Sequence, residues 1–222
     1  MATGLQFRKQ EVVRDAIYDA AINLFVRKGF DETTVEEVAQ AAGVSRGSFF
    51  RYFATKDDLL ARSVVSSGDV LISAAAACPA GLSSLELVSE TALAGIQFSI
   101  SQPRTRQIIE ITSRSISARY AHKSRLVEVE TRLSEVFAAR MRNAAKDDIK
   151  PRMLAIVTLM VVDLTLASWF KGGFKDCSSA SKQVFVELSR MFCGPIPSSK
   201  SAGTQGSRQG RSTRTRRRLV AR

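Results

Sequence analysis

The sequence predicts an all-α protein made of an N-terminal three-helix domain with a helix-turn-helix and a larger C-terminal helical domain. Apolar residues recur at helical spacing along the chain, Gly43 separates two short helix patterns, and a nearly continuous apolar segment spans residues 153–170. With 222 residues and 45% apolar content, the chain is long enough to bury the cores of two small domains.

Both ends of the chain are expected to be flexible. Residues 1–13 include a polar stretch with Arg8 and Lys9, which predicts a loose arm that either reaches a minor groove or is a frayed terminus. Residues 198–222 have few large apolar side chains, which predicts disorder. From Lys200 onward the tail holds eight of the net +12 charges and no acid, leaving +4 for the rest. This polycation either strengthens non-specific DNA binding or is a solvated extension.

A lead helix is expected at the start of residues 14–60, the segment we assign to the helix-turn-helix domain. Its apolar positions share one face, and Gly29 with Phe30 is typical of a helix end. Those positions are Val13, Ile17, Ala21, Leu24 and Phe25. The two helices that follow are too short to fold alone, so the lead helix is predicted to give them a surface to pack against.

The first short helix is predicted to begin at Thr33 and Thr34. Each threonine is followed three residues later by a glutamate, Glu36 or Glu37, the pattern that satisfies the first free amides of a helix. Gly43 then ends the helix, because glycine readily adopts the left-handed conformation found there. One apolar stripe lies between these signals: Val35, Val38, Ala39 and Ala42.

Ser45 is the expected N-cap of the second short helix, in which Phe49 and Phe53 point inward. Gly47 and Arg51 point away from them, Ser48, Phe50 and Tyr52 lie on the flanks, and Arg46 lies in the first turn. This outward side has no acid. A helix of this size and charge is suited to a major groove. Short amphipathic helices joined at a glycine also occur in all-α proteins that never touch DNA.

Thr55 and Asp58 are predicted to cap a third helix, which runs to about Cys78. Lys56 therefore lies at a helix N-terminus, where the backbone amides and the helix dipole favour a phosphate. Over residues 61–197 we expect a second helical domain. Its helices are predicted around residues 85–99, 108–111, 126–141, 153–170 and 184–192.

The helix predicted at residues 153–170 is apolar on nearly every side. Asp163 at mid-length, with Thr158, Thr165 and Ser168, makes a lipid bilayer a poor environment for it, so we expect no membrane association. The helix that follows can cover only one of its faces. The uncovered face predicts a second protein chain.

The sequence contains no P-loop, Rossmann glycine pattern, Gly-x-Ser-x-Gly elbow or His-Glu-x-x-His motif. The single histidine, His122, lies in the charged stretch AHKSR and is expected at the surface. Three cysteines, Cys78, Cys177 and Cys193, predict neither a disulfide framework nor a zinc site, which fits a reducing cytoplasm. We therefore expect no enzymatic activity, no metal and no cofactor.

Residues 14–60 resemble the DNA-binding domain of the TetR family of bacterial transcriptional regulators. The motifs that carry the resemblance are LFVRKGF, the TT before VEEVAQAAGVS, RGSFFRYF and TKDDLL. The resemblance implies that the groove and its phosphates face Arg46, Gly47, Ser48, Phe50, Arg51 and Tyr52, and that Thr34, Ser45 and Lys56 contact the DNA backbone. Phe50 departs from the family, which usually has a tyrosine there. Without the hydroxyl, Phe50 is expected to pack against a thymine methyl.

The same resemblance implies a homodimer that binds a pseudo-palindromic operator in double-stranded DNA. Its interface would be a four-helix bundle formed by residues 151–171 and 179–193 of both chains. The family also implies a pocket for a small apolar effector that releases the DNA. We expect Asp163 to be the one buried charge and to fix the effector's polar end. Candidate lining residues are Phe98, Ile111, Phe137, Met160, Asp163, Trp169 and Phe170, although such residues also form ordinary cores and Asp163 could pair with a cation of the same chain or of its copy.

We therefore expect residues 61–197 to bind an effector and to dimerise in a ligand-responsive regulator, most simply a repressor. One alternative is an architectural DNA-binding protein driven by the basic tail. A high ratio of specific to non-specific affinity would argue against it. A second alternative is an enzyme with an appended DNA-binding head. The missing catalytic motifs argue against that alternative.

Overall fold

The computed structural model describes residues 2–141 and 148–193, and within those residues the chain forms ten α-helices and no strand. The first four are α1 (Ala2–Lys28), α2 (Val35–Ala41), α3 (Arg46–Tyr52) and α4 (Asp57–Ala77). The others are α5 (Ser84–Ser101), α6 (Thr105–Arg114), α7 (Ile116–Lys123), α8 (Leu126–Arg140), α9 (Lys150–Phe170) and α10 (Cys177–Cys193). The tail predicted to be disordered, 198–222, lies outside the described residues. The all-α prediction is confirmed.

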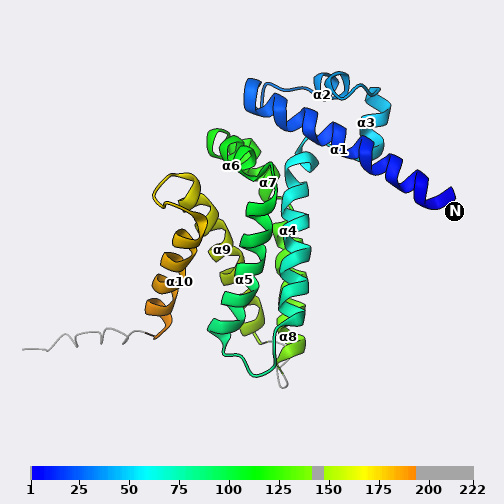
Figure 1. Cartoon of the computed structure of the whole chain (residues 1–222). Coiled ribbons are helices and arrows are strands. Elements are labelled where there is room, and N and C mark those ends of the chain that lie inside the picture. The colour runs from blue at the N-terminus through cyan, green and yellow to red at the C-terminus, as the bar shows by residue number, and fades with distance from the viewer. Residues whose placement is uncertain (1, 142–147, 194–222) are drawn as a thin grey trace, which may run out of the picture.

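We call α1, α2, α3 and the first turns of α4 the head, and the remaining helices the body. The head lies at one end of the molecule, and α4 runs from it down the length of the body (Figure 1). Two glycines with positive φ make the turns of the head, Gly29 at 101° after α1 and Gly43 at 69° after α2. One apolar core joins the head to α6 and α7. Its buried members include Ile17, Ile22, Phe25, Phe49, Leu59 and Leu60.

Helix α1 begins at Ala2, so the prediction of a loose arm over residues 1–13 was wrong for the described part of that segment. No proline or glycine interrupts the chain between Leu5 and Lys28, and most residues in this stretch are good helix formers. Once the second half of the helix is held by core packing, each further residue adds a hydrogen bond without a new nucleation cost. The N-terminal turns of α1 therefore project past α2 and α3 (Figure 1).

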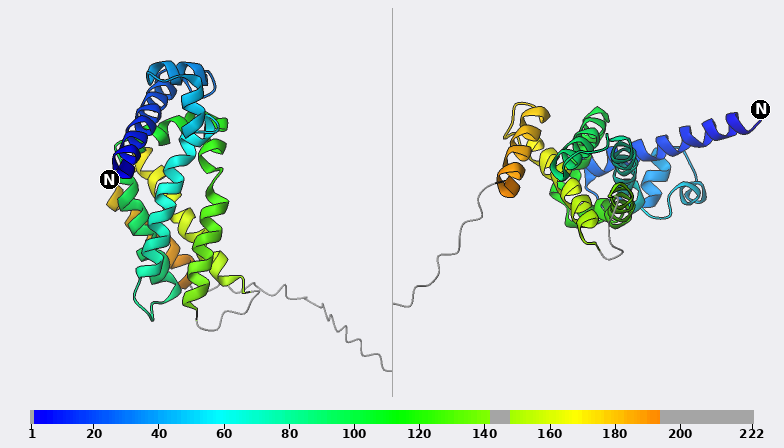
Figure 2. Two further views of the ribbon diagram at one scale, coloured as in Figure 1. Left: turned by 90° about the vertical axis from the view of Figure 1, so that its right-hand side faces the viewer. Right: turned by 90° about the horizontal axis from the view of Figure 1, so that it is seen from below.

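The body is built around four long helices, α4, α5, α8 and α9, which lie side by side (Figure 2). Helix α4 packs against α5 and α8, and α9 packs against the same two helices. At Gly68 the α4 backbone comes so close to α8 that an added Cβ would lie 2.5 Å from the Cγ2 atom of Val129. The buried side chains of the body form two apolar clusters, and Leu154 of α9 contacts both.

Helix α7 was missed by the sequence analysis. Only Ser115 separates α6 from α7, and neither glycine nor proline marks the break. Ser115 has an extended backbone, and its hydroxyl accepts a hydrogen bond from the amide of Ala118 at 3.0 Å, so this one residue ends one helix and caps the next. Ile108 and Ile111 of α6, with Ala118 and Ala121 of α7, then pack under the head.

Polar contacts also join the head to the body. The guanidinium of Arg104 lies 2.9 Å from Asp19 and donates to Asn23 at 2.8 Å. Further pairs are Arg62 with Asp15 at 2.6 Å, Arg125 with Asp58 at 3.3 Å, and Ser115 with Asp31 at 2.7 Å. Each of the arginines in these contacts approaches the head from a different element, α6, α4 or the start of α8.

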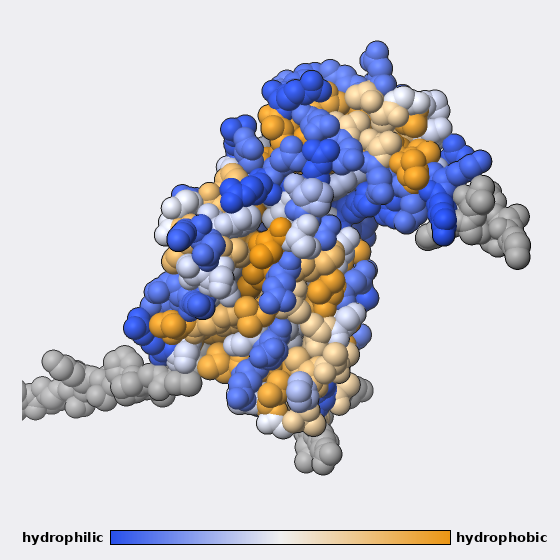
Figure 3. All heavy atoms as spheres, in the orientation of Figure 1, coloured by the Kyte–Doolittle hydropathy of each residue, from blue (hydrophilic) through white to orange (hydrophobic). Residues whose placement is uncertain are grey.

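One face of α9 packs on the body and the other is open. The open face carries large apolar side chains that are 42–49% exposed: Met153, Ile156, Met160 and Leu164. By length and composition α9, like the segment Arg46–Ala77, could also cross a membrane, a test that core helices of soluble proteins pass as well. On the face seen in Figure 3, hydrophobic residues likewise reach the surface of the body between hydrophilic ones.

His122 of α7 is partly buried, so its predicted surface position was wrong. Burial lowers its pKa to about 4 by disfavouring the imidazolium, although Asp163 acts in the opposite direction. The unexpected helix α7, which packs against α4, accounts for the burial.

This burial predicts a pH dependence of stability. Above pH 6.5 the imidazole is neutral in both states, whereas below it the unfolded chain takes up a proton that the folded chain does not. We expect the urea midpoint of the wild type to fall more between pH 7.5 and pH 5 than that of His122→Asn. An equal fall of the urea midpoint in the two proteins would contradict the burial of His122 in the folded chain.

Candidate nucleic-acid interface

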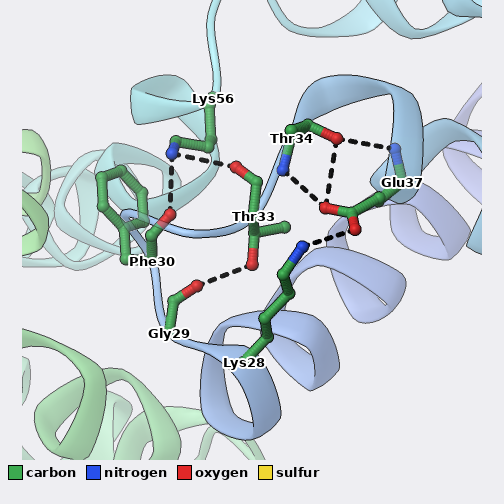
Figure 4. A network of polar contacts seen from close by, with 7 residues as sticks. All are labelled: Lys28, Gly29, Phe30, Thr33, Thr34, Glu37 and Lys56. Atoms are coloured by element: carbon green, nitrogen blue, oxygen red, sulfur yellow. Dashed lines mark hydrogen bonds and ion pairs between the residues drawn. The ribbon is translucent and has the colours of Figure 1, made fainter.

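Helix α2 begins with the predicted capping box at Thr34. The Thr34 hydroxyl accepts from the amide of Glu37 at 3.2 Å, and the Glu37 carboxylate accepts from the amide of Thr34 at 2.9 Å. Glu37 also pairs with Lys28 of α1 at 2.5 Å (Figure 4). The hydrogen bond from Lys28, followed by that from the Thr34 amide, lowers the pKa of Glu37 to about 2. The N-terminus of α2 is therefore tied to the end of α1.

Thr33 does not cap α2, so that part of the prediction was wrong. Its side chain is buried, and the hydroxyl donates to the carbonyl oxygen of Gly29 at 2.6 Å (Figure 4). Glu36 is consequently not the partner of Thr33. It extends toward α3, where its carboxylate lies 3.0 Å from the guanidinium of Arg46.

Helix α3 is held on the head by its inner face. Ser45 is the N-cap, and its hydroxyl accepts from the amide of Ser48 at 3.1 Å. Phe49 is 0% and Phe53 3% exposed, as predicted. Among the residues predicted to face DNA, Arg46, Gly47, Phe50 and Arg51 are exposed and Ser48 is half-buried. Tyr52 is also half-buried, but it packs against the core of the head.

Both arginines of this outer face are supported by neighbouring side chains. Arg46 lies between Glu36 and the ring of Phe50, whose centroid is 5.5 Å from the guanidinium carbon. Arg51 donates to the hydroxyl of Ser48 at 3.1 Å and lies 6.0 Å from the centroid of the Tyr52 ring. The outer face of α3 thus presents two ordered cations next to two aromatic rings.

Lys56 lies at the start of α4, as predicted, and Thr55 and Asp58 form the expected cap hydrogen bonds. Its ammonium, however, is directed into the head (Figure 4). It donates to the carbonyl oxygens of Phe30 at 2.7 Å and Thr33 at 3.0 Å, and it lies 4.3 Å from the centroid of the Phe30 ring. Lys56 therefore fastens α4 to the connection between α1 and α2.

The structure does not bring the candidate effector residues into one pocket. Ile111 belongs to the core beneath the head, Phe137 to one cluster of the body, and Trp169 packs against the other. Phe98 and Phe170 are half-buried, and Met160 is 42% exposed. Asp163 is not a buried charge, so that prediction was wrong: its side chain is 57% exposed and pairs with Lys123 at 2.9 Å. It lies toward the open side of α9 rather than the packed one.

An open cleft of about 630 Å³ lies beneath the head, and the sequence analysis did not identify it. Its lining comes from three separate parts of the chain, represented by Arg14, by Tyr52 with Arg62, and by Arg125. Because these residues form no local motif, only the packing of α1, α3, α4 and α8 brings them together. The cleft separates the end of α3 from the body.

A short helix that is anchored by its apolar side and exposes arginines on the other, after a capped helix and a glycine turn, defines a DNA-binding protein of the helix-turn-helix class. Residues 17–62 match the family described as "Bacterial regulatory proteins, tetR family". The head therefore carries a DNA-binding domain that matches this family, and the chain is a DNA-binding transcriptional regulator.

The likeness to known proteins extends over more of the chain, in sequence to one regulator and in fold to solved structures. The HTH-type transcriptional regulator TcmR of Streptomyces glaucescens is 28% identical over 189 residues, which cover 80% of this chain and 82% of TcmR. The structure is similar to that of NalD, the secondary repressor of the MexAB-OprM multidrug efflux pump in Pseudomonas aeruginosa. That match has a TM-score of 0.58 and 20% identity and covers 86% and 99% of the two chains. A putative TetR-family regulator from Syntrophomonas wolfei gives a TM-score of 0.61 with 17% identity, covering 85% and 98%.

The position of Lys56 predicts that it stabilises the head. Lys56→Met keeps the apolar stem over Phe30 but leaves two backbone carbonyl groups without their donor, so we expect a loss of about 1–2 kcal/mol in the free energy of unfolding. Chemical denaturation measures this loss. Lys171→Met, at an exposed position of the body, is the matched control. A Lys56→Met protein as stable as this control would contradict the prediction.

Proposed function

We propose that this regulator is a repressor that binds a pseudo-palindromic operator as a homodimer and is released by a small apolar effector in the cytoplasm. The observation that carries the proposal is the exposed outer face of α3, with Arg46 and Arg51 ordered on a helix whose phenylalanines are buried. NalD, which has the same fold, is itself described as a repressor.

The proposed DNA contacts follow this face. Arg46, Gly47, Ser48, Phe50, Arg51 and Tyr52 would enter the major groove, while Thr34, Ser45 and Lys56 would lie near the phosphates. The Lys56 ammonium already donates hydrogen bonds to two carbonyl oxygens. At this position the backbone amides at the start of α4 would therefore make the phosphate contact. Phe50 is 43% exposed, which leaves its ring available to a thymine methyl.

The proposed dimer interface is the open side of α9 together with α10. Met153, Ile156, Met160 and Leu164 are spaced along one helical face, and Val186 and Met191 of α10 are also exposed. Apolar side chains gathered in this way mark an interaction surface. A two-fold axis would pair residues 151–171 and 179–193 with their copies and place two α3 helices about 34 Å apart, or a multiple of that distance.

We place the effector in the body, between α4, α5, α8 and α9, where the two apolar clusters meet at Leu154. Asp163 has no part in this site, because it is exposed and paired with Lys123. Two buried hydroxyl groups, on Thr91 of α5 and Thr165 of α9, lack a hydrogen-bond partner among the described residues. They could bond to polar groups of an otherwise apolar effector.

Selection of bound sequences from random DNA tests the operator. We expect a pseudo-palindrome that the full chain binds at least about 10³-fold more tightly than random DNA at physiological salt, the lower end for specific regulators. Screening small molecules for release of that DNA then tests the effector. No enriched sequence would instead favour an architectural protein driven by the basic tail.

The dimer is tested by placing a charge on the open face of α9. Ile156 is 46% exposed, so Ile156→Asp should leave each chain folded while making the interface unfavourable. We expect monomers in sedimentation analysis and a large loss of operator affinity. Ile116→Asp, at a 69% exposed position on α7, is the control. An Ile156→Asp protein that remains dimeric would exclude this interface.

A further inference from the structure

Glu36 pairs with Arg46 on the DNA-facing side of α3, whereas its sequence pattern predicted only a helix cap. It lies in the first turn of α2, and its Oε1 atom is 3.0 Å from Nε of Arg46, the first residue of α3. The side chains are 59% and 67% exposed, respectively. Ion pairs this exposed contribute little to stability. The pair therefore matters more for what Arg46 can bind than for the stability of the head.

The Glu36 carboxylate lies closest to the Nε side of the Arg46 guanidinium, and the Phe50 ring lies 5.5 Å from the guanidinium carbon. The two terminal nitrogens remain as a planar pair of donors. Such a pair matches the O6 and N7 acceptors of guanine in the major groove. Arg51 differs, because one of its terminal nitrogens donates to Ser48 and no carboxylate holds it among the described residues.

The carboxylate also affects binding to every DNA sequence. A negative charge beside the groove-facing helix is repelled by phosphates and lowers non-specific affinity. The same charge restrains Arg46, so that less side-chain freedom is lost when a guanine is bound. Glu36 therefore lowers the affinity for every DNA site, but it favours the contact between Arg46 and a guanine.

We propose that Glu36 is a positioning residue for specificity: it orients Arg46 to read one guanine in each half of the operator and disfavours DNA that lacks this guanine. The proposal rests on the proposed operator binding and names the base that the site recognises. Phe50 supports Arg46 from its other side, in addition to any thymine contact of its own.

The test uses the full chain and the selected operator, in which one guanine per half-site is replaced in turn by 7-deazaguanine. This base lacks the N7 acceptor but keeps normal pairing. At one position we expect the wild type to lose about tenfold in affinity, a typical value for one bidentate base contact. Glu36→Gln should lose only about twofold there and should bind random DNA several-fold more tightly.

Glu32→Gln is the matched control, because Glu32 is an exposed acid of the head that forms no ion pair within the described residues. It removes the same charge and should keep the tenfold sensitivity to 7-deazaguanine. Arg46→Lys keeps the positive charge but not the planar donors, so it should be insensitive. Adding Glu36→Gln to Arg46→Lys should then cause no further loss of discrimination.

Two results would overturn the proposal: full sensitivity to 7-deazaguanine in Glu36→Gln, or retained sensitivity in Arg46→Lys. These results are distinct from a failure of the proposed function, in which the wild type selects no operator at all.

Discussion

The interface depends on the burial of Phe49 and Phe53 beneath α3. A helix of seven residues forms too few hydrogen bonds to be stable by itself, so its shape and direction come from the surface that receives these rings. That surface is made by α1, α2 and the start of α4, and Ser45 and Gly43 set the angle at which the chain enters it. The outer side chains of α3 can be exposed and polar because Phe49 and Phe53 hold the helix against the core of the head.

The polar network around Lys56 and Glu37 complements this packing. Lys28 and Glu37 join the end of α1 to the start of α2, while Lys56 joins the connection between these two helices to α4 (Figure 4). Helix α3 lies between segments that are fastened in this way. Its position relative to the body is consequently set by groups that do not themselves face DNA.

Features governed by neighbours in sequence could be predicted. The caps at Thr34, Ser45 and Thr55, the glycine turn at Gly43 and the inward phenylalanines all follow from short-range patterns, and the structure has each of them. The exposed apolar side of α9 could also be anticipated, because a helix that is apolar all round needs more partners than one neighbour can supply.

Features governed by distant contacts could not be predicted. Asp163 looked like a buried charge because its neighbours are apolar, yet its side of α9 is open and Lys123, 40 residues away, pairs with it. The inward turn of Lys56 depends on two carbonyl groups of another segment. Helix α7 was missed because Ser115 alone marks its start, and the burial of His122 was missed with it. The partner of Glu36 lies across a turn rather than three residues away.

The ionic character of the contacts between head and body has a consequence for measurements of DNA affinity. Arg62, Arg104 and Arg125 meet carboxylates of the head at sites reached by solvent, so dissolved ions weaken these pairs as well as those with phosphate. To the extent that DNA binding alters these pairs, the dependence of affinity on ionic strength has an intramolecular component in addition to the release of counterions from DNA. Counting phosphate contacts from that slope alone would then include the ion pairs between head and body.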